Sequence, residues 1–281
     1  MIVTILLDNN PHPELSLKTE HGLSMYFEFE NTKWLFDLGA SEAFSEKACK
    51  LGIDISDVDC VVISHGHNDH TGGLEHFLKE NKKAKIYISS KLSEKTFYSY
   101  RHQIKKDITV NHDIITQNIE RFIFIDDDIK ISDNFVLISN IQQNSQTPKA
   151  NCKLYISDKN EEHQDDFKHE IVLAVNEPQG IIVFSGCSHN GILNILDACS
   201  EYFKTSNIIA CIGGTHLIDS DKINQFETDM EIDDLGMKIK KEYPNMQLIT
   251  GHCTGNNAFN RFLNIFGDSL QSFYSGKNIS F

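Results

Sequence analysis

The sequence has no long run of lysine or arginine, and its acidic residues outnumber its basic ones. The formal net charge is −14. An acidic chain without a basic cluster offers little to the phosphate backbone of a nucleic acid. We therefore expect no nucleic-acid partner.

The sequence also has no CxxC pair and no long hydrophobic segment. Its seven cysteines, an odd number, are typical of a reducing compartment and not of a disulfide framework. The apolar run at residues 2–7 has no basic flank and is too short for a signal peptide or a membrane span, so it predicts a strand. We therefore expect a cytoplasmic protein with no membrane partner.

The overall pattern is typical of an α/β protein. The chain has 281 residues, 40% of them hydrophobic, which is ample for a sizeable core. Strand-like runs alternate with helix-like segments, except between about residues 91 and 170, where Lys, Asp, Asn and Gln are frequent. We predict a single domain over residues 1–281, with an insertion or a cap at about 91–170.

A histidine-rich turn stands between a predicted strand at residues 58–63 and a predicted helix at about 73–81. Its metal-competent side chains are His65, His67, Asp69 and His70. Neutral imidazole and carboxylate are common ligands of borderline metals. A polar, solvated loop would account for the composition, but a fold rarely needs so many such groups in one turn. The turn therefore predicts a metal site.

Three further histidines follow predicted strands, each close to a glycine: His189, His216 and His252. Sites in sheet proteins with helices behind are built at the carboxyl ends of strands, so we expect these side chains to converge with the turn. His189 and His252 are the natural suppliers of further metal ligands. For His216, beside Thr215, we expect a substrate-facing role, such as a phosphate or carboxylate contact. The alternative is a histidine that is hydrogen-bonded within its loop.

These donors suit one or two divalent metal ions, for which zinc is the first expectation and manganese and iron are alternatives. Two ions about 3.5–4 Å apart would hold a shared hydroxide that is nucleophilic at neutral pH. They would also stabilise charge on the attacked phosphoryl or carbonyl oxygen. Asp69 could orient the nucleophile as well as bind metal, so Asp69 and His216 are the candidate catalytic residues. We expect an anionic small-molecule substrate, and a homo-oligomer is left open.

The segment Ser64–Leu74 resembles the HxHxDH signature of the metallo-β-lactamase superfamily. More narrowly, several segments look like the subgroup of dihydropterin–ribofuranosylaminobenzene 5′-phosphate synthase-like proteins. They are residues 8–9, 20–24, 36–39, 185–189, 213–217 and 250–255. The resemblance spans nearly the whole chain and is thin from 91 to 165.

The resemblance implies a four-layer αββα sandwich with the metals at one edge. The ligands that it implies for the first ion are His65, His67 and His189. Those that it implies for the second ion are Asp69, His70 and His252. It also implies that Asp37 orients metal ligands, and that the loop with Glu20 and His21 lies near the site, whereas composition alone predicts a surface turn there.

One feature departs from the superfamily pattern. The superfamily usually bridges its ions with an aspartate at the end of a later strand, and the matching position here offers Cys187. We favour a small packed residue at Cys187; the alternative is an additional thiolate ligand, because metals deprotonate thiols. We interpret Cys253, beside His252, as a packing residue, and His169 with Glu170 as a capped or packed pair.

We therefore expect a metal-dependent hydrolase that uses a metal-bound hydroxide on a phosphoester or related ester. The alternative is a pterin-linked synthase, which would condense a pterin electrophile with an aminobenzene ribose phosphate; it depends on the subgroup resemblance alone. A non-hydrolytic redox or metal-sensing protein ranks third. Redox members of the superfamily tend to place Glu where His67 stands and to carry a flavin domain, and this sequence has neither feature.

Overall fold

The computed structural model describes residues 1–14, 19–101, 104–158 and 161–281. The chain divides into two compact units. Unit 1 comprises Met1–Asp126, Lys153–His169 and Phe273–Phe281, and unit 2 comprises Asp127–Cys152 and Glu170–Ser272. Each unit has its own large sheet and its own hydrophobic core, and each is described by itself. The expectation of a single domain stays a prediction.

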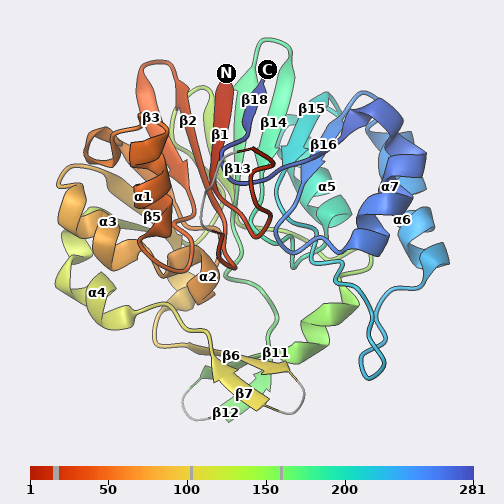
Figure 1. Cartoon of the computed structure of the whole chain (residues 1–281), viewed down its shortest axis with the longest axis horizontal. Helices are drawn as coiled ribbons and strands as arrows, with labels where there is room; N and C mark the ends of the chain where they lie inside the picture. Colours follow the sequence, from red (N-terminus) through yellow and green to blue (C-terminus); the bar gives the residue numbers. More distant parts are fainter. Residues whose placement is uncertain (15–18, 102–103, 159–160) are drawn as a thin grey trace. The chain divides into compact units, whose positions relative to one another are not determined.

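The large sheet of unit 1 has seven strands in the order β18-β1-β2-β3-β4-β5-β8. Their bounds are β1 (Ile2–Leu7), β2 (Ser24–Phe29), β3 (Thr32–Phe36), β4 (Cys60–Val62), β5 (Lys85–Ser89), β8 (Phe122–Ile125) and β18 (Asn278–Ser280). Figure 1 labels β1, β2, β3, β5 and β18 of this sheet. The pairs from β18 to β3 are antiparallel, and those from β3 to β8 are parallel. The hairpin of β2 and β3 turns through Glu30 and Asn31, both with positive φ, as a tight turn between twisted strands requires.

Helices of unit 1 pack against this sheet. They are α1 (Ala43–Lys50), α2 (Asn68–Thr71), α3 (Leu74–Glu80) and α4 (His112–Gln117), with the 3₁₀ helices η1 (Ile55–Asp57), η2 (Ser90–Leu92) and η3 (Ile119–Arg121). Phe44 of α1 and Phe77 of α3 are fully buried in the core of unit 1. Burying side chains of this size contributes about 1.5–3 kcal/mol each, so these two rings hold the helices to the sheet.

A second, four-stranded antiparallel sheet of unit 1 lies within the region that was expected to be an insertion or a cap. Its order is β12-β11-β6-β7, and its bounds are β6 (Thr96–Arg101), β7 (Ile104–Asp107), β11 (Leu154–Asp158) and β12 (Glu161–Gln164). Phe97 of β6 and Ile156 of β11 are buried in the core of unit 1. The described residues of β7 and β12 are exposed, so they show no alternation of buried and exposed residues that would predict strands from sequence.

The sheet of unit 2 also has seven strands, in the order β17-β16-β15-β14-β13-β10-β9. Their bounds are β9 (Ile129–Lys130), β10 (Phe135–Ile138), β13 (Val172–Glu177), β14 (Gly180–Phe184), β15 (Ile208–Ile212), β16 (Gln247–Thr250) and β17 (Leu270–Ser272). Figure 1 labels β13, β14, β15 and β16 of this sheet. From β14 to β17 the pairs are parallel. Parallel neighbours end at the same edge of a sheet, and candidate site residues lie in the loops that follow three of these strands.

Helices follow the parallel strands of unit 2. They are α5 (Ile192–Phe203), α6 (Asp229–Glu242) and α7 (Asn256–Phe266), with η5 (Gly267–Ser269); η4 (Lys149–Lys153) lies where the chain passes from unit 2 to unit 1. The start of α6 is fixed by a capping box, in which Thr228 and Glu231 satisfy each other's backbone N–H groups. Across the described ranges, no helix combines the length and the apolar character that crossing a bilayer would require.

Candidate metal site

The histidine turn of unit 1 gathers three buried imidazoles. It follows β4, which lies between β3 and β5 in the parallel part of the sheet, and it leads into the short helix α2. The ring centroid of His65 lies 4.5 Å from that of His67 and 4.1 Å from that of His70. All three side chains are buried. The turn therefore concentrates metal-competent nitrogen atoms away from bulk water.

Asp37 fixes the orientation of one of these rings. It directly follows β3 with a φ of 60°, and its Oδ2 lies 2.6 Å from Nδ1 of His70. The same carboxylate accepts hydrogen bonds from the N–H and the hydroxyl of Ser64, at 2.8 and 2.7 Å. A carboxylate on one ring nitrogen fixes the tautomer and turns the other nitrogen toward the site. Nε2 of His70 lies 3.6 Å from Oδ2 of Asp69.

The loop before β2 meets the turn through His21. Nε2 of His21 lies 3.2 Å from Oδ2 of Asp69, and the side chain of Asp69 is 16% exposed. Glu20 instead ties down the loop after β3. Its carboxylate accepts the N–H groups of Ala40 and Ser41 at 3.2 and 3.1 Å, and the hydroxyl of Ser41 at 2.6 Å. Of this pair, the side chain that reaches the histidine turn is His21.

Asp165 and His169 also reach the turn, and the sequence did not mark them as site residues. Oδ2 of Asp165 lies 3.0 Å from Nε2 of His169 and 3.8 Å from Nε2 of His67. The N–H of Gly66 donates to Nδ1 of His169 at 3.3 Å. The expectation of a packed pair described only part of the role of His169. No local signal marks Asp165, because its partner His67 lies far earlier in the chain.

Burial and neighbouring side chains together shift the pKa values of His67 and Asp165. Burial lowers the pKa of the His67 imidazole and outweighs the interaction with the Asp165 carboxylate, which raises it. Burial alone would raise the pKa of Asp165, but His169 and His67 hold that pKa well below its usual range. Asp165 is therefore an anion beside His67, whose neutral ring retains a lone pair for a metal.

Main-chain hydrogen bonds brace the histidine turn. The N–H of Asn68 donates to the carbonyl of Ile108 at 2.8 Å, and the N–H of Val110 donates to the carbonyl of Gly66 at 3.0 Å. A Cβ atom at Gly66 would lie 2.4 Å from Cδ2 of Leu92, so this position requires glycine. The segment after β7 therefore holds the backbone of the turn in place.

Three parallel strands of unit 2 are followed by residues with left-handed backbone. Ser188 follows β14, His216 follows β15 and His252 follows β16, with φ values of 56°, 50° and 50°. Positive φ is uncommon outside glycine and costs energy. Such conformations cluster at functional sites, and here they occur at one edge of the sheet.

Cysteine and histidine side chains gather at this edge in two groups. The ligand atoms of Cys187, His189 and His216 lie within 4.8 Å of one another, and so do those of Cys187, His252 and Cys253. The ring centroids of His189 and His216 are 4.2 Å apart. Imidazole and thiolate are ligands of zinc and iron. Unit 2 therefore contains side chains that could hold a metal ion.

Polar neighbours hold His189 in position. The carboxylate of Glu170 accepts the backbone N–H groups of His189 and Asn190, both at 2.8 Å. Oδ1 of Asn151 lies 3.0 Å from Nδ1 of His189, and Nδ2 of Asn151 donates to the carbonyl of His189 at 2.8 Å. This arrangement orients the ring of His189, as outer partners of a metal ligand do.

Contacts between strand ends fix Thr215 and Cys253. The hydroxyl groups of Thr215 and Thr254 lie 2.9 Å apart, and Sγ of Cys253 accepts the N–H of His216 at 3.3 Å. Burial alone would raise the pKa of the Cys253 thiol. Interactions with Cys187, His216 and His252 outweigh burial and hold that pKa well below its usual range. Cys253 therefore has polar surroundings that a packing residue does not need.

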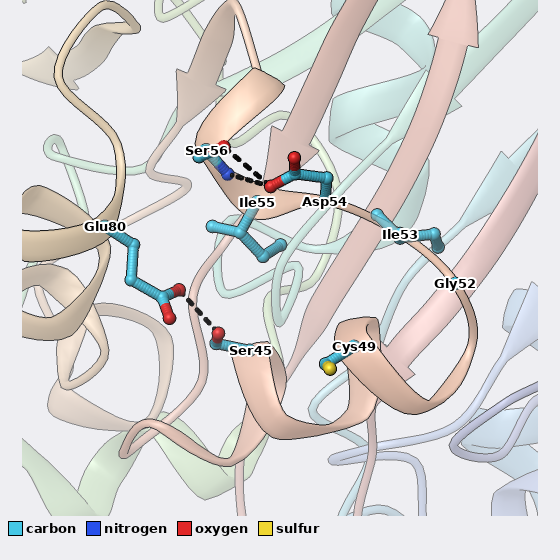
Figure 2. Close-up of a pocket in the computed structure, with 8 residues that line it drawn as sticks. All are labelled: Ser45, Cys49, Gly52, Ile53, Asp54, Ile55, Ser56 and Glu80. Carbon is cyan, nitrogen blue, oxygen red and sulfur yellow. Dashed lines mark hydrogen bonds between the residues drawn. The ribbon is translucent and has the colours of Figure 1, made fainter.

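A hollow of about 460 Å³ in unit 1 lies outside the predicted site residues (Figure 2). Its lining consists of Ser45, Cys49, Gly52, Ile53, Asp54, Ile55, Ser56 and Glu80. Both carboxylates already accept hydrogen bonds, Glu80 from the hydroxyl of Ser45 at 2.6 Å and Asp54 from the hydroxyl of Ser56 at 2.7 Å. Both hydrogen bonds join residues of the lining to one another, and they identify no ligand.

The family model of the metallo-beta-lactamase superfamily matches residues 18–135, which include the histidine turn. The fold agrees with this match. The structure of Tm1679, described as a metal-dependent hydrolase of the beta-lactamase superfamily, superposes with a TM-score of 0.83 at 27% identity, covering 100% of this chain and 99% of that one. The chain is thus similar to the metallo-β-lactamase superfamily in its histidine turn and in its fold, and the expected fold class is confirmed.

Two proteins of Methanocaldococcus jannaschii are similar in sequence. One is named 7,8-dihydropterin-6-methyl-4-(beta-D-ribofuranosyl)-aminobenzene-5'-phosphate synthase; it is 29% identical over 94% of this chain and 90% of its own length. The other is uncharacterized and is 24% identical over 77% of this chain and 80% of its own length. The chain is thus an enzyme of the metallo-β-lactamase fold, with a similar protein in the synthase subgroup that the sequence motifs indicated.

Proposed function

We propose that this protein is a metal-dependent hydrolase of small anionic esters, with phosphoesters as the first candidates. The observation that carries the proposal is the histidine turn of unit 1. His65, His67 and His70 are buried beside one another, and Asp37 orients the ring of His70. Several buried imidazoles beside one another, with a carboxylate that orients one of them, suit a metal ion better than they suit a packed core.

The donor set fits a divalent metal. The burial of His67 keeps its ring neutral, and the buried Nδ1 of His216 has no hydrogen-bond partner among the described residues. We propose the ligands by their positions in the sequence motifs: His65, His67 and His189 for one ion, and Asp69, His70 and His252 for another. Zinc is the first expectation, with manganese and iron as alternatives.

A divalent ion in such a site supplies Lewis acidity and lowers the pKa of water. The residues of this chain supply orientation and proton handling. We propose that Asp69, which is partly exposed and lies 3.2 Å from His21, orients the attacking water through Oδ2. We propose that His216, with Thr215 beside it, contacts the anionic group of the substrate.

The proposal is tested by metal removal and by ligand substitution. Treatment with a chelator should abolish hydrolysis of aryl phosphate mono- and diesters, and added zinc should restore it. His67→Ala and Asp69→Ala should each lower kcat/KM by about 100-fold or more. His76→Ala is the matched control, because His76 lies on α3 and pairs with Glu80 at 3.2 Å. Full activity of the His67 and Asp69 variants would reject the proposal.

A second candidate is a synthase that joins a pterin to an aminobenzene ribose phosphate. It is favoured by the full-length similarity to the named synthase. In that reaction the aryl amine would bond to the methyl carbon of the pterin, and a leaving group on that carbon would depart with its electron pair. Incubation of both substrates and detection of the joined product by mass spectrometry tests this candidate. Joined product without ester hydrolysis would place the synthase first.

A further inference from the structure

Cys187 belongs to both groups of ligand atoms in unit 2. It shares one group with His189 and His216 and the other with His252 and Cys253, and in each group the atoms lie within 4.8 Å of one another. In a tetrahedral zinc site, bond lengths of about 2.0–2.3 Å place ligand atoms roughly 3.3–3.8 Å apart. Each group can therefore close on one ion with small side-chain movements.

We propose that Cys187 and Cys253 bind metal as thiolates, with Cys187 bridging two metal positions. Cys187 is buried and is the third residue after the end of β14. A thiolate sulfur has several lone pairs and can serve two ions, as a carboxylate does. Cys253 then adds a second sulfur at the position that it shares with His252.

The surroundings of Cys253 are those of a ligand and not of a packing residue. Its Sγ accepts the backbone N–H of His216 at 3.3 Å, which stabilises negative charge on sulfur. Gly214 makes room for the sulfur, since a Cβ atom there would lie 2.3 Å from Sγ. Two residues next to this sulfur have a left-handed backbone conformation: His216, whose N–H contacts it, and His252, which directly precedes Cys253.

His216 provides a separate indication. Its Nδ1 is buried and has no hydrogen-bond partner among the described residues. A buried polar nitrogen left in this state costs about 1–3 kcal/mol, and a metal ion would satisfy it. The unpartnered nitrogen therefore marks the group of Cys187, His189 and His216 as a metal position.

The surroundings of Cys211, another buried cysteine of unit 2, differ from those of Cys253. Cys211 lies within β15 and belongs to the apolar core of the unit. Its surroundings are those of a packing residue, and burial raises the pKa of its thiol to about 12.

Soft sulfur ligands favour zinc or iron over manganese, so the two proposed thiolates, Cys187 and Cys253, also narrow the choice of metal.

The test uses cobalt in place of the native metal, because cobalt–thiolate bonds absorb in the near ultraviolet. The full-length protein loaded with cobalt should show this band. Cys187→Ser should lower it by about two thirds, because a bridging Cys187 makes two of the three cobalt–sulfur bonds, and Cys253→Ser should lower it by about one third; the double variant should abolish it. Cys211→Ser, the matched control, should leave it unchanged. Cys187→Asp should keep two bound ions per chain while lowering the band as Cys187→Ser does.

A measurement on the unsubstituted protein covers the case in which a variant does not fold. X-ray absorption at the zinc edge should show sulfur at about 2.3 Å from the metal. A shell of nitrogen and oxygen only would overturn the proposal, as would a disulfide between Cys187 and Cys253 found by mass spectrometry. The proposal depends on the proposed metal dependence. Metal-dependent activity with unchanged bands in both serine variants would reject the thiolates alone, and a protein that binds no metal would reject both.

Discussion

Nδ1 of His70 lies 2.6 Å from Oδ2 of Asp37, and both side chains are fully buried. The carboxylate also accepts two hydrogen bonds from Ser64, the residue that precedes the histidine turn. One buried anion therefore connects the end of β3, the end of β4 and a candidate metal ligand. Anions placed in this way raise the basicity of the ring that they contact and fix its tautomer.

Asp37→Asn should weaken metal binding. The amide keeps the size of the carboxylate, but it carries no charge and can accept only through one oxygen, so the ring of His70 loses its orienting anion. Metal affinity should fall by about 10- to 100-fold, as measured by competition with a coloured chelator. The free energy of unfolding should fall by about 1–3 kcal/mol. Asp54→Asn, on the exposed N-cap of η1, is the control. Equal metal affinity in the two variants would contradict this assignment.

Asp165→Asn should also weaken metal binding, through His67. The side chain is buried and its Oδ2 lies within 3.8 Å of Nε2 of His67 and 3.0 Å of Nε2 of His169. Loss of the charge should lower metal affinity by about 10-fold or more. Asp166→Asn is a closely matched control, because Asp166 pairs with Lys168 at the surface.

A structural role alone for Asp165 would give a different result. Asp165→Asn would then lower the urea midpoint of unfolding and leave the metal affinity of the folded protein unchanged. Equilibrium dialysis against zinc, carried out below the unfolding transition, separates these outcomes. Restoration of affinity in Asp165→Glu would further support a positioning role for the carboxylate.

Lys47→Met should remove a pH dependence of stability. Lys47 is buried in α1, where its ammonium donates to the hydroxyl of Ser275 at 3.2 Å. Burial lowers its pKa to about 8, against the ordinary 10.5, although the charges of Glu20 and Asp8 oppose that shift. The unfolded chain binds the proton more tightly, so the free energy of unfolding rises with pH between about 8 and 10.5.

The measurement is the difference between the two proteins. Urea unfolding at pH 7.0, 9.0 and 10.5 should show a smaller rise for Lys47→Met than for the unsubstituted chain, because contributions from other groups cancel. Lys50→Met, at an exposed position of the same helix, should follow the unsubstituted chain. Parallel curves for all three proteins would show that Lys47 does not set this dependence.

The sequence predicted those parts of the site that local patterns determine. Strand-end positions such as His189 and His252 follow from apolar runs that are followed by glycine. Asp165 could not be predicted, because its neighbours in sequence are polar and exposed and its partner His67 is distant in the chain. Cys253 was interpreted as packing for a related reason. Its donor, the N–H of His216, belongs to another strand end.

The main-chain hydrogen bonds that hold the histidine turn affect how the site can vary. The hydrogen bonds from Asn68 to Ile108 and from Val110 to Gly66 join main-chain atoms, so exchange of an imidazole of the turn removes neither of them. Ordering this loop costs conformational entropy when the chain folds, and the main-chain hydrogen bonds offset that cost. Individual imidazoles can therefore be exchanged for other donors while the scaffold is kept, which leaves this turn open to a change of metal preference by single substitutions.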